Sequence, residues 1–259
     1  MSLGRLLRRL VPKPLWPERY LLQLTLDRSK KKIMGGPFEG MAYVDRAFSS
    51  MIIPKLVGIY ENELFGVIRE IVADPPDWMI DIGAAEGYYA VGLARSCPKL
   101  RSIAFEMESE ARTLLQEVAA LNGVADRIDL RGTCDPAELK KALAEGEGRR
   151  GLLVCDCEGY EALLLDPEKE PALRGVPILV ELHDSYTREI MPLMRRRFES
   201  SHEIEEIWTY NEPNRQFPFS TPYLRLLPKV YKDAMLSEHR PVPMTWFWMK
   251  PRQPASSFR

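Results

Sequence analysis

An aspartate, two glycines and a later glutamate have the spacing of a site that binds a ribose beside a positive charge. Asp81 and Gly83 end an apolar run, WMIDIG, and Gly87 follows them in the pattern D-x-G-x-x-x-G. Such glycines permit a tight turn and a close approach of the backbone to a ligand. Glu106 ends the next apolar run, twenty-three residues after Gly83, where an acid can accept hydrogen bonds from both ribose hydroxyls.

Two nucleotide cofactors use such a loop, and the charge of Asp81 separates them. NAD needs the pattern G-x-G-x-x-G so that its pyrophosphate can sit on a helix N-terminus. The middle glycine is absent here, and Asp81 would repel a pyrophosphate. S-adenosylmethionine carries an ammonium, a sulfonium and a ribose but no phosphate, which suits a nearby carboxylate. We therefore predict an S-adenosylmethionine site. Its predicted contact residues are Asp81, Gly83, Ala84, Gly87, Glu106, Met107 and Asp156.

A second group of polar residues follows two later apolar runs and could move a proton. Asp156 follows the run GLLVC, while Glu181 and His183 lie in the run LVELHD. Because side chains alternate along a strand, Glu181 and His183 share one face. A hydroxyl is a weak nucleophile at neutral pH and needs a base or a metal to take its proton. We predict that His183 is this base and that Asp156 and Glu181 are the other catalytic residues. Glu181 or Asp184 is expected to orient the imidazole.

A magnesium site is the alternative use of the same region. Asp156, Glu181 and Asp184 offer carboxylate oxygens, the ligands that Mg²⁺ prefers, and such an ion would acidify a bound hydroxyl. We favour the base and predict no resident metal. Glu161 is interpreted as the acidic first turn of a short helix, EALLL, where a carboxylate complements the helix dipole.

These residues need a sheet that brings the ends of the apolar runs together. Five runs alternate with helical segments between residues 78 and 198, which predicts parallel strands joined by right-handed crossovers. Two later runs, HEIEEIWTY and PMTWFWMK, have no crossover helix between them and predict an antiparallel pair. A further helix is predicted within residues 51–72, after Pro54. The fold class is therefore α/β: a Rossmann-like doubly wound sheet of seven strands, five parallel and then an antiparallel terminal pair.

Several of these motifs resemble those of a known family. DIGAAEG with FEME is similar to the cofactor motifs of class I S-adenosylmethionine-dependent methyltransferases. CDCEGYE and LVELHD resemble the hallmark motifs of the FkbM-type methyltransferase family, and LVGIYENEL resembles a segment that precedes the glycine loop there. The resemblance covers about residues 35–210. It implies the class I methyltransferase fold and transfer of a methyl group to a hydroxyl on a sugar, glycolipid or natural product.

One departure and several alternatives accompany this resemblance. Many class I enzymes hold the adenine amino group with a Gly-Asp pair after the third strand, but here Asp135 is displaced in RGTCD, which leaves the adenine contact open. The Asn/Asp-Pro-Pro-aromatic motif of base N-methyltransferases and the Pro-Cys of cytosine C5 enzymes are both missing. A protein or RNA acceptor, approached through Arg195–Arg197, and a non-catalytic module that binds S-adenosylmethionine remain as alternatives.

Composition limits the partners and the location. The 259 residues include 36 Lys and Arg against 37 Asp and Glu, so no nucleic-acid partner is expected. The sequence has no apolar run of eighteen residues and no secretory signal, so a cytoplasmic location is expected. Residues 1–50 are predicted to form a basic N-terminal extension that packs on a methyltransferase domain of residues 51–259. Leucines at helical spacing beside Arg5, Arg8 and Arg9 favour packing of this leader on the domain, with weak contact with a membrane surface as the alternative.

Overall fold

The computed structural model describes residues 17–183, 189–209, 215–240 and 244–252. The chain divides into two compact units, the first comprising Met1–Asn62 with Asn211–Arg240 and the second Glu63–Tyr210 with Pro241–Arg259. This division differs from the predicted boundary at residue 50, because residues 51–62 and 211–240 belong to the first unit. Among the described residues, no helix has the length and apolar character needed to cross a membrane.

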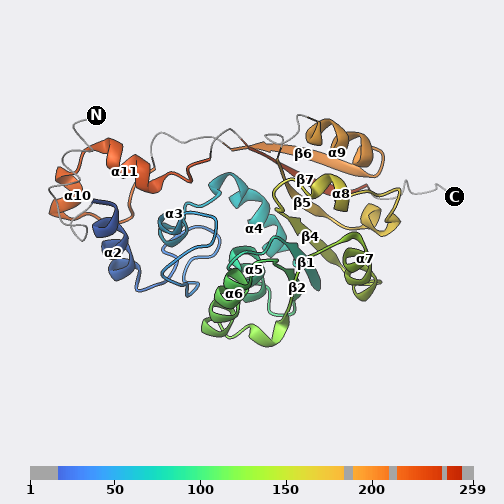
Figure 1. The fold of residues 1–259 in the computed structure, drawn as a ribbon, viewed down its shortest axis with the longest axis horizontal. Helices are drawn as coiled ribbons and strands as arrows, with labels where there is room; N and C mark the ends of the chain where they lie inside the picture. The colour runs from blue at the N-terminus through green and yellow to red at the C-terminus, as the bar shows by residue number, and fades with distance from the viewer. Residues whose placement is uncertain (1–16, 184–188, 210–214, 241–243, 253–259) are drawn as a thin grey trace. The chain divides into compact units, whose positions relative to one another are not determined.

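The second unit contains a seven-stranded sheet in the order β3-β2-β1-β4-β5-β7-β6 (Figure 1). Strands β1 to β5 pair in parallel, and β7 runs antiparallel to both β5 and β6. This is the Rossmann-like sheet of the class I methyltransferase fold, and it confirms the predicted strand number and directions. The strands are β1 (Trp78–Ile82), β2 (Arg101–Phe105), β3 (Ile128–Arg131), β4 (Gly151–Cys155), β5 (Ile178–Leu182), β6 (His202–Trp208) and β7 (Thr245–Pro251).

The predicted antiparallel pair is also confirmed. Strand β6 pairs with β7 from His202 opposite Pro251 to Trp208 opposite Thr245. Burial explains the placement of β7 inside the sheet and of β6 at its edge. The first five residues of β7 are buried, whereas every residue of β6 after His202 is exposed or half-buried. An edge strand of this kind, rich in glutamate, discourages pairing with other chains.

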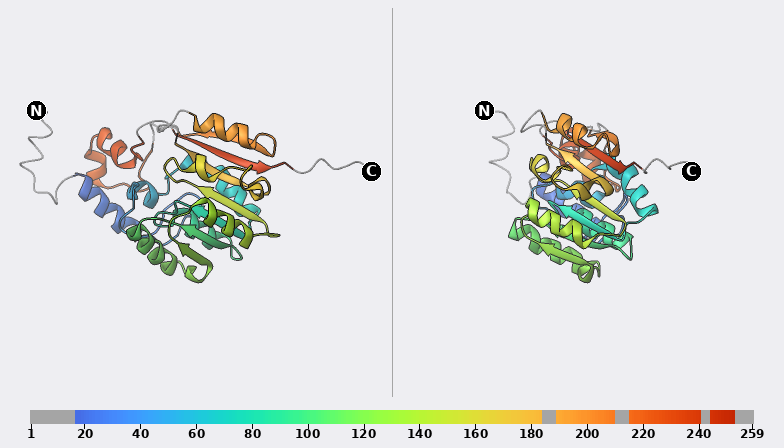
Figure 2. Two further views of the ribbon diagram at one scale, coloured as in Figure 1. Left: turned by 45° about the vertical axis from the view of Figure 1, so that its right-hand side comes forward. Right: turned by 90° about the vertical axis from the view of Figure 1, so that its right-hand side faces the viewer.

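Helices cover both faces of this sheet (Figures 1 and 2). The crossovers through α5 and α6 lead from β1 toward β3, and the return through α7 to β4 places α7 and α8 on the opposite face. Asp135 caps α7, since its carboxylate accepts hydrogen bonds from the amides of Ala137 and Glu138. The helices are α4 (Phe65–Ala73), α5 (Tyr88–Ser96), α6 (Ser109–Leu121), α7 (Pro136–Glu145), α8 (Glu161–Leu164) and α9 (Ile190–Phe198).

The first unit is helical and has its own small core. It contains α2 (Pro17–Ser29), α3 (Ile52–Val57), α10 (Pro222–Leu226) and α11 (Lys229–Leu236). Its buried centre consists of Leu21, Ile53, Val57, Leu224 and Leu236. Residues separated by more than 160 positions thus share one core, and this is why residues 211–240 group with the N-terminal segment.

The prediction of one helix after Pro54, within residues 51–72, is wrong. The segment forms α3 and α4, with a break that begins at Gly58. Gly58 has a φ of +76°, and a Cβ atom there would lie 2.3 Å from the carbonyl oxygen of Gly35. The first helix ends where these two backbone segments approach each other closely. The helical periodicity of the sequence does not indicate this contact.

Candidate active site

Two glycines shape the loop after β1, and each makes room for protein atoms. Gly83 has a φ of +82°, and a Cβ atom there would lie 1.7 Å from the carbonyl oxygen of Asp156. Gly87 has a φ of +91°, and its Cβ atom would lie 2.9 Å from Cγ of Leu115 on α6. The sequence predicts a tight turn at Gly83 and close approach of the backbone to a ligand at Gly87. The structure adds that Gly83 lets the loops after β1 and β4 touch, and that Gly87 lets α5 pack against α6.

Glu106 is held rigidly at the carboxyl end of β2. Its Oε2 accepts a hydrogen bond from the amide of Ala85 at 2.8 Å, and its Oε1 accepts one from the amide of Glu108 at 2.7 Å. Arg112 donates to the carbonyl oxygens of Glu106 and Met107. Each carboxylate oxygen has a second lone pair, so the group can still accept a hydrogen bond from a ribose hydroxyl. The neighbouring Met107 side chain is exposed and accessible to a ligand.

Asp81 is buried near the end of β1 in a position that favours a cationic ligand. Its Oδ2 has no hydrogen-bond partner among the described residues. Burial raises the pKa of Asp81 to about 7, helped by the charges of Asp156 and Glu106 and opposed by a hydrogen bond from the amide of Ala90. A cation bound beside this carboxyl group would remove the cost of its ionisation. The orphaned oxygen and its acidic surroundings therefore fit the ammonium and sulfonium of S-adenosylmethionine.

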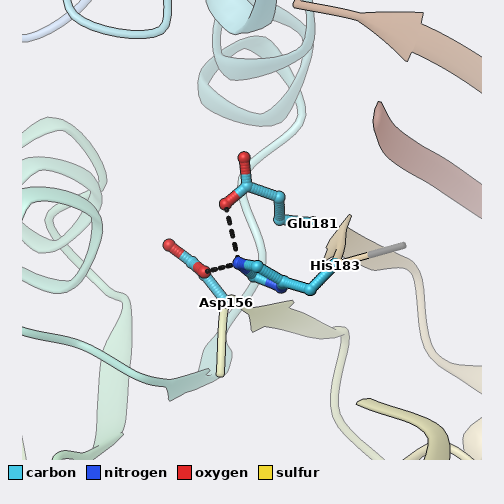
Figure 3. A group of neighbouring side chains, drawn as sticks. All are labelled: Asp156, Glu181 and His183. Carbon is cyan, nitrogen blue, oxygen red and sulfur yellow. Dashed lines mark ion pairs between the residues drawn. The ribbon is translucent and has the colours of Figure 1, made fainter. Parts of the chain in front are cut away.

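The structure brings three predicted catalytic residues together at the carboxyl ends of β4 and β5. The His183 Nε2 atom lies 3.5 Å from Oδ1 of Asp156 and 3.6 Å from Oε2 of Glu181 (Figure 3). Glu158, which is largely exposed, also reaches to 3.5 Å from this nitrogen. His183 itself is buried. One imidazole nitrogen thus faces three carboxylates that come from two adjacent strand ends.

The residue that orients His183 is Glu161. Its Oε1 lies 2.7 Å from Nδ1 of His183, and its side chain is fully buried. The prediction that Glu161 acts only at the start of α8 is wrong. The residue expected from the sequence to orient the imidazole is Glu181 or Asp184. Glu181 approaches the other ring nitrogen, and Asp184 lies outside the described residues. A lone acid opening an otherwise apolar one-turn helix was the signal that could have identified Glu161.

Electrostatics couple the titrations of His183 and Glu161, which lie in hydrogen-bond contact. Burial opposes the charged imidazolium, but the hydrogen bond with Glu161 and the charges of Asp156, Glu161 and Glu158 outweigh it and raise the pKa of His183. Burial likewise opposes ionisation of Glu161, yet the hydrogen bond and charge of His183 bring its pKa below the ordinary value. Burial raises the pKa of Asp156, while His183 and Glu181 work in the opposite direction. Below the pKa of His183, the arrangement stabilises the protonated imidazolium. Above that pKa, the imidazole is neutral and is held in one orientation, as a base requires.

The same group has the composition of a cation site. One ligand atom each from Asp156, Glu181 and His183 lie within 4.8 Å of one another. The set of one nitrogen and two oxygens differs from the predicted Asp156, Glu181 and Asp184 set, whose third member is outside the described residues. An imidazole ligand suits first-row transition metals better than Mg²⁺.

Comparison with known proteins gives one related sequence and many related folds. No protein-family model matches the chain. The chain is 32% identical over 131 residues to the ribosomal RNA small subunit methyltransferase G of Frankia alni, an alignment that covers 46% of this chain and 47% of the relative. The chain therefore spans about half the length of the curated relative that it matches.

Among solved structures, the chain is similar to the O-methyltransferase TomG of Streptomyces achromogenes in complex with SAM, with 17% identity, a TM-score of 0.44 and coverage of 61% of this chain and 77% of that one. It is also similar to the O-methyltransferase of Bacillus cereus in complex with SAH, with 12% identity, a TM-score of 0.42 and coverage of 77% and 86%. With likenesses this distant, the fold of this chain is assigned from its own strand order and directions.

Proposed function

We propose that this protein is an S-adenosylmethionine-dependent methyltransferase that acts on a hydroxyl group. The observation that carries the proposal is the His183–Glu161 dyad, placed after β4 and β5 in the same sheet whose β1 and β2 ends present Asp81 and Glu106. In a doubly wound sheet, ligands bind at this edge, outside the carboxyl ends of the strands. The loop after β1, with Asp81 and Glu106, would hold the cofactor. His183 and Glu161 would act on the hydroxyl of the acceptor.

The residues suggest a division of labour in the reaction. When bound, S-adenosylmethionine supplies a methyl group made electrophilic by the sulfonium. Glu106 would hold the ribose and Asp81 the cationic end. The Nε2 atom of His183 would take the proton of the acceptor hydroxyl, while its Nδ1–H donates to Glu161 and keeps the ring oriented. Asp156 and Glu181 would position the hydroxyl in line with the methyl group and stabilise the imidazolium that forms.

We propose a sugar, glycolipid or natural-product hydroxyl as the acceptor, on the resemblance of CDCEGYE and LVELHD to the FkbM-type family. The test is incubation of the purified protein with labelled S-adenosylmethionine and separate pools of glycans, lipids and small phenols. Transfer of label to one hydroxyl-bearing pool is expected. Binding of the cofactor without transfer to any acceptor would contradict the proposal and favour a non-catalytic module.

An RNA acceptor is the second candidate, because the related sequence from Frankia alni is named for ribosomal RNA. The net charge of −1 and the hydroxyl-directed dyad favour the first candidate. Addition of ribosomal RNA as a further pool in the same assay separates the two, since only one of them predicts labelled RNA.

Glu106→Ala is expected to weaken the binding of S-adenosylmethionine by roughly tenfold or more. The wild type should bind in the micromolar range, about −7 to −8 kcal/mol. Loss of the carboxylate removes the acceptor for the ribose hydroxyls and two contacts that fix the loop. Titration calorimetry measures the change, with Glu110→Ala as the control because this exposed acid lies on the neighbouring turn of α6. Equal affinity in Glu106→Ala and wild type would contradict the assignment.

Glu161→Gln is expected to move the pH profile of kcat/KM toward lower pH. His183 must be neutral to accept a proton, so activity rises with pH through its pKa, which lies above the ordinary value of 6.5. Removal of the Glu161 charge lowers that pKa, and looser orientation should reduce turnover by roughly 10–100-fold, less than the 10²–10⁴-fold that a positioned base contributes in total. Glu158→Gln is the control and should shift the profile less, because its carboxylate is 69% exposed. An unchanged profile in Glu161→Gln would argue against the dyad.

A further inference from the structure

A cavity of about 450 Å³ lies in the first unit, within the size range of small-molecule sites. Every residue that lines it falls between positions 215 and 236, so it is separate from the strand ends of the sheet. None of the residues assigned to methyl transfer lines it. Its polar lining consists of Arg215, Gln216, Ser220, Arg225, Lys229, Lys232 and Asp233.

Two of the four cations in this lining are already neutralised. Arg215 donates to Oε1 of Glu238 at 2.6 Å and to Oδ1 of Asn62 at 2.9 Å. Lys229 lies 2.8 Å from both carboxylate oxygens of Asp233, the one acid in the lining. These pairs hold the walls of the cavity in place and leave the remaining two cations to set its charge.

Arg225 and Lys232 are the cations that face the cavity without a carboxylate partner among the described residues. Arg225 donates through Nε to Oγ of Ser220 at 3.2 Å, and Lys232 donates to the carbonyl oxygen of Leu224 at 3.3 Å. In addition, the buried Nε of Arg215 has no hydrogen-bond partner in this part of the chain, and that side chain is only 10% exposed. A positive cavity with unused donors calls for an anion that accepts several hydrogen bonds.

The apolar side chains of this region bear on the kind of molecule that would carry such an anion. Phe217 and Phe219 form one wall, with ring centroids 5.4 Å apart. Leu226 is 85% exposed and Val230 is 68% exposed, and each follows in sequence a residue that lines the cavity, Arg225 or Lys229. Large aliphatic side chains with this exposure, interleaved with cations, are typical of surfaces that rest in the boundary between lipid headgroups and acyl chains.

We propose that α10 and α11 dock on an anionic membrane surface, with a lipid phosphate in the cavity between Arg225 and Lys232. Leu226 and Val230 then enter the acyl boundary, where their burial adds to the electrostatic attraction. A free phosphate ester would fill the cavity but leave both aliphatic side chains in water. The exposed aliphatic side chains therefore favour the lipid source over the soluble one.

Vesicle sedimentation of the full chain tests the proposal. The protein should bind phosphatidylcholine vesicles only when phosphatidylglycerol is included, and binding should weaken as salt screens the charges. Arg225→Glu with Lys232→Glu should lower the affinity at least about tenfold, since each basic residue near the surface contributes about fivefold. Leu226→Ser with Val230→Ser should also weaken binding. Lys140→Glu, an exposed charge reversal on α7, is the matched control and should have no effect.

Three outcomes would overturn the proposal. The first is equal vesicle binding by the Arg225→Glu/Lys232→Glu variant and the wild type, when the two proteins unfold at the same temperature. The second is loss of binding only in an Arg8→Glu/Arg9→Glu variant, which would assign the membrane contact to the N-terminal leader. The third is saturable binding of glycerol 3-phosphate in calorimetry without any vesicle binding, which would assign the cavity to a soluble phosphate ester.

Discussion

Replacement of His183 by alanine is expected to lower methyl transfer by about 10²–10⁴-fold and to leave the affinity for S-adenosylmethionine unchanged, the range that a positioned base contributes. The imidazole is buried, is oriented by Glu161 and faces Asp156, so its removal takes away the proton acceptor without altering the loop that would hold the cofactor. Single-turnover kinetics with the identified acceptor and calorimetry with the cofactor measure the two quantities separately. His239→Ala, an exposed histidine of the first unit, is the control and should retain full activity.

The His183→Ala experiment also distinguishes catalysis by a His183 base from catalysis by a bound metal ion. If a cation bound by Asp156, Glu181 and His183 does the work, a chelator should abolish activity, a divalent ion should restore it, and Asp156→Ala should be more damaging than His183→Ala. We expect the opposite ranking and no effect of the chelator. Full activity of His183→Ala after complete metal removal would refute both mechanisms and leave alignment of the substrates as the source of the rate.

Gly83→Ala is expected to destabilise the second unit by about 2–6 kcal/mol, the sum of backbone strain and overpacking. A Cβ atom at a φ of +82° is strained, and it would lie 1.7 Å from the carbonyl oxygen of Asp156, so the loops after β1 and β4 must separate. Because a domain has about 5–15 kcal/mol of stability in total, the loss would be a large share of it. Chemical unfolding monitored by tryptophan fluorescence measures the change.

Gly132→Ala is the matched control for this substitution. Gly132 follows β3, has no left-handed φ, and has no atom within 4 Å of a Cβ built on it. Its replacement should change the free energy of unfolding by less than about 0.5 kcal/mol, the usual range for an unconstrained surface site. Similar stabilities of the two variants would show that the contact between the loops after β1 and β4 is not needed.

The sequence by itself determined the sheet and the acids at its strand ends. Alternation of apolar runs with helical segments is a local pattern, and parallel pairing with right-handed crossovers follows from it on general grounds. Once the strands were placed, Asp81, Glu106 and Asp156 had to lie at the same edge of the sheet, because parallel strands end together. His183 and Glu181 followed from the two-residue period of β5.

Only the tertiary structure decided which groups touch. Glu161 is five residues from Asp156 in sequence, but its contact with His183 depends on the turn of the chain through Glu158 and Gly159, both at positive φ. The reason for Gly83 is likewise a contact with another loop. The grouping of residues 211–240 with the N-terminal helices depends on side chains more than 160 positions apart. Such long-range contacts leave no periodic trace, because packing selects them by shape and charge after the local elements have formed.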